Sequence, residues 1–82
     1  MVYVYILKSE TTGRLYIGQT DNIRRRLGEH NRGKNVSTRH GGPWSLLGAL
    51  PCKTRSEAVQ LEQKLKSFKR RDRVLAYLKR HS

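Results

Sequence analysis

Residues 2–30 read VYVYILKSETTGRLYIGQTDNIRRRLGEH, and this segment predicts a strand, a turn, a second strand and a helix. The run Val2–Leu7 is rich in β-branched and aromatic residues, which suit a pleated sheet. Both of its faces are apolar, which favours a central strand that is covered on both sides. Turn residues at 9–13, with Gly13 able to adopt a positive φ, lead into a second strand at Arg14–Gln19. The two strands therefore form an antiparallel hairpin.

A helix is expected after the hairpin. Thr20 or Asp21 can cap it, and the pattern carries it to about Arg32. Its apolar side is thin, because it consists of Ile23 and Leu27 alone. Three consecutive arginines lie between those two positions, and an arginine run of this kind usually forms a solvated face.

A polar, glycine-rich loop at residues 31–42 precedes a third extended segment, Trp44–Leu50. A loop of this length in a compact domain is usually functional or mobile. Trp44 has two interpretations, a base-stacking residue or a core residue, and the second is favoured for a lone tryptophan in an extended segment.

Two helices are expected to close the chain. Thr54 and Glu57 form a capping box at the start of the first, and Asp72 is a candidate cap for the second. The first presents a helical stripe of Ala58, Leu61, Leu65 and Phe68. The second packs through Val74, Leu75 and Leu78. The order ββαβαα predicts one mixed α/β (α+β) domain over residues 1–82, with a three-stranded antiparallel sheet flanked by helices.

The chain is strongly basic, with 18 Lys and Arg against 6 Asp and Glu among 82 residues and a formal net charge of +12. Such an excess predicts salt-sensitive binding to polyanions. Nucleic acid is the leading candidate, because the basic residues are spread through predicted elements and do not form a tail. A membrane surface is disfavoured, because no basic helix carries Trp or Phe densely on its other face.

The single cysteine, Cys52, excludes an intrachain disulfide and a thiolate cluster. The apolar run Val2–Leu7 is too short for a signal peptide or a membrane span. A reducing, cytoplasmic setting is therefore expected.

Five side chains are candidates for chemistry on a phosphate. Tyr5 and Tyr16 should lie roughly opposite each other in the hairpin, and Arg26 and His30 share a helix face through their spacing of four. Glu62 lies beside an apolar stripe and offers an oxygen ligand to one hard cation, Mg²⁺ or Mn²⁺. The fork of Arg26 suits a phosphate oxygen. Arginine and a metal-bound water are expected to lower the pKa of a neighbouring phenol.

Each of these residues also has a plain structural interpretation. Tyrosines commonly fill half-buried sheet faces, and His30 alone is weak evidence for catalysis. Glu62 can simply pair with Lys66 at i+4, a contact of about 0.2–0.5 kcal/mol. The functional interpretation rests on the combination.

Two tripeptides, Tyr3-Val4-Tyr5 and, ten residues later, Tyr16-Ile17-Gly18, resemble the pair that names the GIY-YIG endonucleases. Gly33-Lys34 and Ser37-Thr38 are similar to a stretch that follows the first helix in small stand-alone bacterial members. The first helix contributes Arg26 and His30 to the resemblance, and the second contributes Ser56-Glu57-Ala58, Glu62 and Leu65-Lys66. The resemblance covers nearly the whole chain. The N-terminal domain of bacterial excinuclease C is among the family members that the chain resembles.

The resemblance implies a three-stranded antiparallel sheet flanked by helices and single-metal hydrolysis of DNA. Tyr5 would be the general base or water-orienting group, with Tyr16 as its hydrogen-bonded companion. Arg26 would stabilise the pentavalent phosphate, and His30 would assist proton transfer or positioning. Glu62 would hold one Mg²⁺ or Mn²⁺. Gly18 would let the backbone turn beneath the site, where a side chain would intrude.

The sequence departs from the family pattern at two points. Tyr3 replaces the first glycine, which strand pairing does not require, and no asparagine follows Glu62, although several branches place one there.

The first hypothesis is a metal-dependent endonuclease of DNA repair type. It would act on branched, damaged or single-stranded DNA, with a separate protein partner to supply target recognition. The alternative is a catalytically silent nucleic-acid-binding module. An RNA-binding role is disfavoured, because RRM-type and KH-type motifs are lacking. The expected nucleic-acid contacts are Arg24, Arg25, Lys34, Arg39, Lys69 and Arg70.

Overall fold

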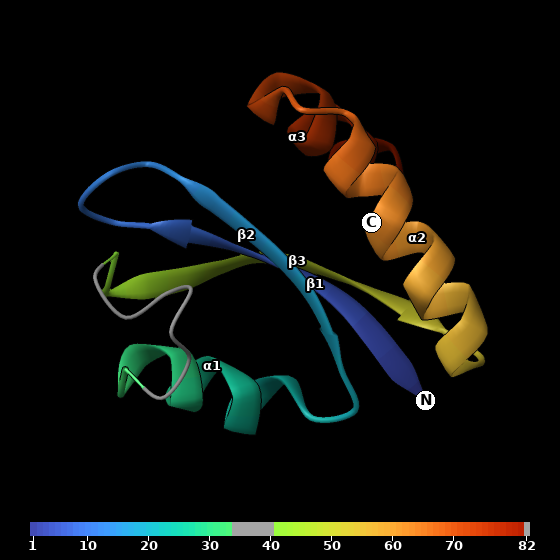
Figure 1. Cartoon of the computed structure of the whole chain (residues 1–82), viewed down its shortest axis with the longest axis horizontal. Coiled ribbons are helices and arrows are strands. Elements are labelled where there is room, and N and C mark those ends of the chain that lie inside the picture. The colour runs from blue at the N-terminus through green and yellow to red at the C-terminus, as the bar shows by residue number, and fades with distance from the viewer. Residues whose placement is uncertain (34–40, 82) are drawn as a thin grey trace.

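Three strands and three helices follow one another in the predicted order ββαβαα, in a computed structural model that describes residues 1–33 and 41–81 (Figure 1). The strands are β1 (Val2–Ser9), β2 (Leu15–Thr20) and β3 (Trp44–Cys52). The helices are α1 (Ile23–Asn31), α2 (Arg55–Ser67) and α3 (Arg71–His81). The predicted fold class is thereby confirmed.

The sheet has the order β2-β1-β3, and both pairings are antiparallel. β1 is therefore the central strand, as its two apolar faces predict. Tyr5 pairs with Gly18, and Tyr16 pairs with Leu7, so the two tyrosines are offset by two residues. They still share a face, because side chains alternate along a strand.

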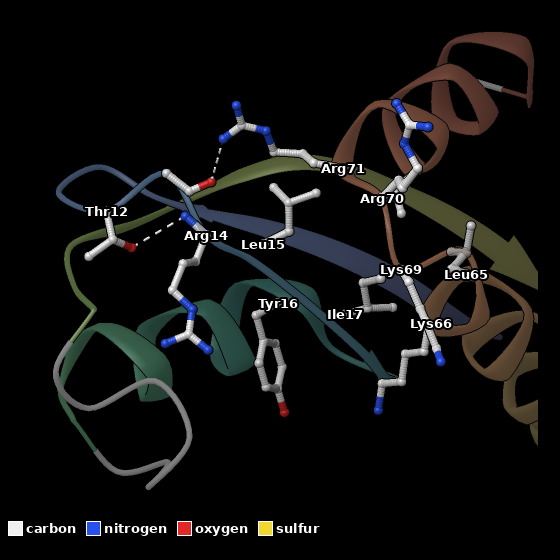
Figure 2. A pocket seen from close by; sticks show the side chains of 12 residues that line it. Thr12, Arg14, Leu15, Tyr16, Ile17, Leu65, Lys66, Lys69, Arg70 and Arg71 are labelled. Atoms are coloured by element: carbon white, nitrogen blue, oxygen red, sulfur yellow. Dashed lines mark hydrogen bonds between the residues drawn. The ribbon is translucent and has the colours of Figure 1, made fainter.

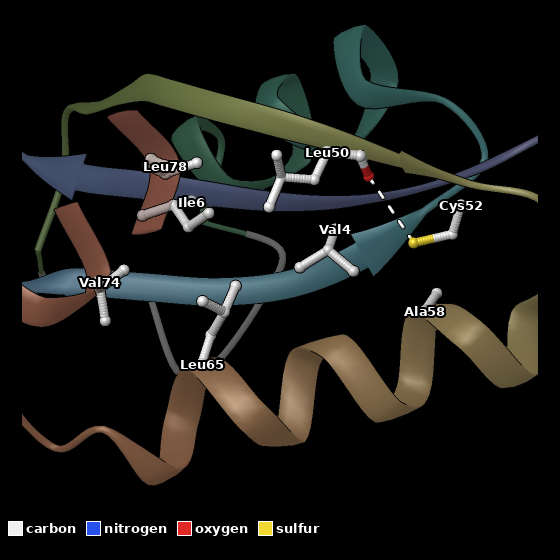
Figure 3. Close-up of a cluster of buried hydrophobic side chains, with 8 residues drawn as sticks. All are labelled: Val4, Ile6, Leu50, Cys52, Ala58, Leu65, Val74 and Leu78. Carbon is white, nitrogen blue, oxygen red and sulfur yellow. Dashed lines mark hydrogen bonds between the residues drawn. The ribbon is translucent and has the colours of Figure 1, made fainter. Parts of the chain in front are cut away.

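Each face of β1 has its own core. Val4 and Ile6 pack with the buried residues of α2 and α3, among them Leu65 (Figure 3). Tyr5 and Leu7 point the other way and pack with Trp44, toward the side of the sheet that α1 covers (Figure 1). Trp44 is only 7% exposed, which supports its interpretation as a core residue.

The cap of α1 differs from the expected one. Asn22 is the N-cap, and its side chain accepts a hydrogen bond from the backbone N–H of Arg25 at 3.0 Å. The prediction of Thr20 or Asp21 was wrong, because β2 extends to Thr20. The Thr20 hydroxyl instead accepts a hydrogen bond from the Asn22 backbone N–H.

The cap of α2 is the predicted one, since the Thr54 hydroxyl accepts from the Glu57 N–H at 3.2 Å. The Glu57 carboxylate reaches the N–H of Lys53, one residue before the cap, at 3.0 Å. In α3, Asp72 lies inside the first turn and pairs with Arg70, so it does not cap the helix.

The apolar stripe of α3 is narrower than predicted. Val74 and Leu78 are buried, but Leu75 is 38% exposed, so its predicted core role was wrong. None of the helices in the described part of the chain has the length and apolar character needed to cross a membrane.

Candidate active site

Three rings meet on the face of the sheet that α1 covers. The Tyr5 hydroxyl lies 2.9 Å from Nε2 of His30, in a buried hydrogen bond between β1 and α1. The ring centroid of Tyr16 lies 4.7 Å from that of His30 and 6.2 Å from that of Tyr5. Tyr5 thus bonds to His30 and not to Tyr16, its expected partner. The hairpin and the helix bring these three predicted residues together.

Gly18 makes room for the Tyr5 phenol. A Cβ atom built at Gly18 would lie 2.7 Å from the hydroxyl oxygen and 2.9 Å from Cζ of Tyr5. The expectation that a side chain would intrude here is therefore confirmed. The backbone does not turn at this point, however, because Gly18 lies within the regular strand β2. Glycine is needed for close approach alone.

Arg26 lies one helical turn before His30, beside the Tyr5 phenol. Its Nη1 atom is 2.9 Å from Oε1 of Glu29, and this ion pair holds the guanidinium in place. The Arg26 side chain is 34% exposed, so a phosphate oxygen can reach it from solvent. A planar guanidinium of this kind suits a phosphate that carries developing negative charge.

Burial sets the protonation states of the Tyr5–His30 pair. Desolvation raises the pKa of Tyr5 above 10.0, and the guanidinium of Arg26 opposes this rise only in part. The lowered pKa that we expect with a metal-bound water stays a prediction, because Arg26 alone does not outweigh desolvation. Burial, together with the positive charge of Arg26, also lowers the pKa of His30 below 6.5. Both groups are neutral at neutral pH.

The Tyr5–His30 hydrogen bond has two possible directions, one for each tautomer of the neutral imidazole. In one tautomer the Tyr5 hydroxyl donates to Nε2, and in the other Nε2–H donates to the phenol oxygen. In the first arrangement the phenol has an acceptor for its proton, although its own pKa is raised.

Glu62 approaches from the other side of the sheet. It lies on α2, and its Oε1 accepts a hydrogen bond from the Gln19 amide of β2 at 3.2 Å. Arg55 donates to the Gln19 carbonyl oxygen at 3.0 Å, which turns the amide nitrogen toward Glu62. Lys66 donates to Oε2 at 2.8 Å, so the predicted i+4 pair is present.

The five candidate residues are thus divided by strand β2. Tyr5, Tyr16, Arg26 and His30 share the α1 face, and Glu62 lies across the edge strand. The negative charge of Glu62 still acts on Tyr5, whose pKa it raises. Gly18, which carries no side chain, lies on β2 between them.

The residues at this edge fit a hydrated Mg²⁺ better than a permanently bound ion. The described residues contain no group of three His, Cys, Asp or Glu side chains that could hold a metal. Mg²⁺, however, usually keeps several waters and uses one or two carboxylates together with substrate phosphates. Glu62 is a carboxylate of that type, 19% exposed and oriented by an amide donor.

The predicted nucleic-acid contacts fall on two surfaces. Arg24 and Arg25 are exposed on α1, and Arg25 pairs with Asp21 at 3.3 Å. Lys69 and Arg70 lie at the junction of α2 and α3. The predicted contacts Lys34 and Arg39, and the similarity at Gly33-Lys34 and Ser37-Thr38, involve residues 34–40, which lie outside the described part of the chain.

Sequence reasoning missed three supporting residues. Glu29 forms an ion pair with Arg26, and the spacing of three residues between them on one helix was a signal of this pair in the sequence. Gln19 donates to Glu62 and Arg55 orients Gln19, but Gln19 and Arg55 lie 36 residues apart in the sequence. No local pattern joins a strand residue to a distant helix start.

A family model described as the GIY-YIG catalytic domain matches residues 1–74. The hairpin, the Tyr5–His30 bond and the position of Arg26 lie within this range. The chain therefore belongs to the GIY-YIG family, which is a family of nucleases.

Among its relatives, a UPF0213 protein of Streptococcus agalactiae is 38% identical over 80 residues, covering 96% of this chain and 89% of the relative. One from Oceanobacillus iheyensis is 37% identical over 73 residues, covering 88% and 84%. The solution NMR structure of a UPF0213 protein from Bacillus halodurans is 35% identical, with a TM-score of 0.55. That match covers 89% of this chain and 79% of the other.

Proposed function

We propose that this protein is a divalent-metal-dependent endonuclease that hydrolyses phosphodiester bonds in DNA. The observation that carries the proposal is the buried 2.9 Å hydrogen bond between Tyr5 and His30, with Arg26 beside it. A neutral phenol with a neutral imidazole acceptor can exchange protons with water, and a guanidinium next to them suits the phosphate that this water attacks.

The roles of the residues follow from this geometry. Tyr5 orients the attacking water and accepts its proton, while the phenol proton passes to Nε2 of His30. The water oxygen forms a bond to phosphorus as the bond to the leaving oxygen breaks. Arg26 donates to a non-bridging oxygen, and Tyr16 packs on His30 to keep the imidazole in place. Glu62 would hold one Mg²⁺ or Mn²⁺, which when bound neutralises charge on the phosphate and the leaving oxygen.

The preferred substrate in this proposal is branched, damaged or single-stranded DNA, as in DNA repair. A nicked or flapped strand can be bent over the edge of a small sheet more easily than an intact duplex. A partner protein would direct the domain to its target in the cytoplasm. The lone thiol, Cys52, is buried and free, which suits a reducing compartment.

The experiment is a nicking assay on plasmid and branched oligonucleotides, in Mg²⁺ or in EDTA, with wild-type protein and Glu62→Ala. Cleavage should require both the ion and the carboxylate, whereas DNA binding should survive in Glu62→Ala. Cleavage that is indifferent to EDTA and to Glu62→Ala would contradict the proposal.

A second candidate function is a silent nucleic-acid-binding module. The ion pair between Lys66 and Glu62 favours it, because a lysine at 2.8 Å occupies the carboxylate oxygen that a metal would need. On this hypothesis DNA binding falls with salt, no strand is cut, and Glu62→Ala leaves affinity unchanged or slightly higher. Loss of cleavage with retained binding in Glu62→Ala would exclude the module.

A further inference from the structure

A groove of about 610 Å³ lies on the opposite side of β2 from the Tyr5–His30 pair. It runs from the β1–β2 turn along β2 to the junction of α2 and α3 (Figure 2). Leu15 and Ile17 point into it, and Tyr16 between them points away, toward the α1 side (Figure 2). Its volume is in the range of about 300–1,000 Å³ that small-molecule pockets have.

The floor of the groove is apolar and its rim is basic. Leu15 and Ile17 form the exposed part of the floor, and Leu65 is fully buried beneath it. The basic lining residues are Arg14, Lys66, Lys69, Arg70 and Arg71. The Arg14 guanidinium extends to the same side of β2 as Tyr16 (Figure 2), so the cations on the groove side are those of α2, α3 and their junction. None of the described residues that line the groove is acidic.

Several of these cations are available to a ligand. Arg71 donates to the Gly13 carbonyl at 2.8 Å, and Arg70 pairs with Asp72 at 3.2 Å, so both are held near the rim. The side chain of Lys69 has no hydrogen-bond or ion-pair partner within residues 1–33 and 41–81, and the ion pair of Arg70 is exposed to solvent. Lys69 has a φ of 58°, which places it in a left-handed turn between the two helices.

The groove adjoins the candidate metal ligand. Lys66 lines the groove and also contacts Glu62 at 2.8 Å. The ring of Tyr16, in contrast, points away from the groove and packs on His30 (Figure 2). The groove therefore borders the Glu62 edge of the site, and β2 separates it from the Tyr5–His30 pair.

We propose that the groove binds an unpaired nucleotide of the strand to be cut, with its base on the apolar floor and its phosphates on Lys69 and Arg70. This inference rests on the proposed function and specifies its substrate class. In a duplex the bases are stacked on one another, so only an unpaired base can use an apolar floor. Phosphates alone would need the cations but would leave Leu15 and Ile17 unused.

The test measures binding without cleavage. Fluorescence anisotropy in EDTA compares a single-stranded oligonucleotide with the duplex of the same sequence, using the 82-residue chain. The test variant is Lys69→Asn with Arg70→Gln, because asparagine tolerates the left-handed conformation at 69. The control is Lys79→Gln with Arg80→Gln, which removes the same charge from exposed positions of α3.

The test variant should lose roughly tenfold in affinity for the single strand relative to the control, and its salt slope should fall by about 1.4, at ~0.7 for each lost phosphate contact. Affinity for the duplex should fall no more than in the control. Equal losses for both DNA forms, or no loss beyond the control, would overturn the proposal. The proposal would also be overturned if polyglutamate bound as tightly as the single strand and lost the same affinity in the test variant, since the occupant would then be an acidic peptide.

The two proposals fail separately in this design. A protein that binds single strands through the groove but never cuts them in Mg²⁺ would reject the nuclease and keep the groove. A protein whose Lys69→Asn/Arg70→Gln variant binds and cuts single strands as the wild type does would reject the groove and keep the nuclease.

Discussion

The Tyr5 hydroxyl and Nε2 of His30 are 2.9 Å apart, and this contact joins the central strand to α1 inside the protein. Both groups are neutral at neutral pH, because burial raises the pKa of Tyr5 and lowers the pKa of His30. The bond therefore contributes to stability as well as to the proposed proton transfer.

Tyr5→Phe should lower the free energy of unfolding by about 1 kcal/mol, because it deletes one buried hydrogen bond and keeps the ring. Urea denaturation measures this change. Tyr16→Phe is the matched control, since among the described residues the Tyr16 hydroxyl has no hydrogen-bond partner, only ring contacts. An equal loss of unfolding free energy in both variants would contradict a stabilising Tyr5–His30 hydrogen bond.

Gly18→Ala should destabilise the protein by about 1–3 kcal/mol, because the new methyl group would lie 2.7 Å from the Tyr5 hydroxyl oxygen. Gly28→Ala on α1 is the control, since its methyl would meet only the flexible end of Arg32 at 3.3 Å. Alanine should raise stability at that helical position by about 0.5–1 kcal/mol. Thermal denaturation of both variants measures the contrast, and a stable Gly18→Ala would refute the close packing.

Stability should fall as the pH drops below 6.5. The pKa of His30 is lowered in the native state, so below the unfolded pKa of 6.5 the unfolded chain binds more protons than the native protein. The contribution of the neutral His30 to stability is fully present above pH 6.5 and is lost as the pH falls toward the lowered native pKa. Urea midpoints from pH 7.5 to 4.5 test this in wild type and His30→Gln, with the exposed His81→Gln as control. If the urea midpoint of His30→Gln fell with pH as steeply as that of the wild type, the prediction would be contradicted.

Lys66→Gln should strengthen Mn²⁺ binding several-fold, because it removes the cation that competes for Glu62 at 2.8 Å. Electron paramagnetic resonance of free Mn²⁺ measures the affinity without any cleavage. Lys64→Gln on the same helix removes the same charge beside Tyr77 and should change the affinity less. Binding that persists in Glu62→Gln would place the ion elsewhere.

The elements of the fold were predictable because the β-branched and aromatic run of β1 and the helical stripe of α2 are local signals in the sequence. The cap of α1 was missed because Thr20, Asp21 and Asn22 are all good capping residues. Only the end of β2 at Thr20 decides among them. That end depends on pairing with Tyr3 and not on the local sequence.

The candidate site was predictable where spacing along one helix determines it, as for Arg26 and His30. The division of the site by β2 was not, because Glu62 belongs to a helix that packs on the opposite face of the sheet. The raised pKa of Tyr5 was also missed, because desolvation depends on complete packing and outweighs the neighbouring arginine.

The most direct measurement is the single-turnover rate of DNA cleavage in Mg²⁺ by Arg26→Ala, beside Arg80→Ala at an exposed position of α3. Arg26→Ala should reduce the rate by about 10²–10³-fold, the typical cost of losing one donor to a developing charge, while Arg80→Ala cleaves at nearly the wild-type rate. Equal rates in the two variants would contradict a phosphate site beside Tyr5 and His30.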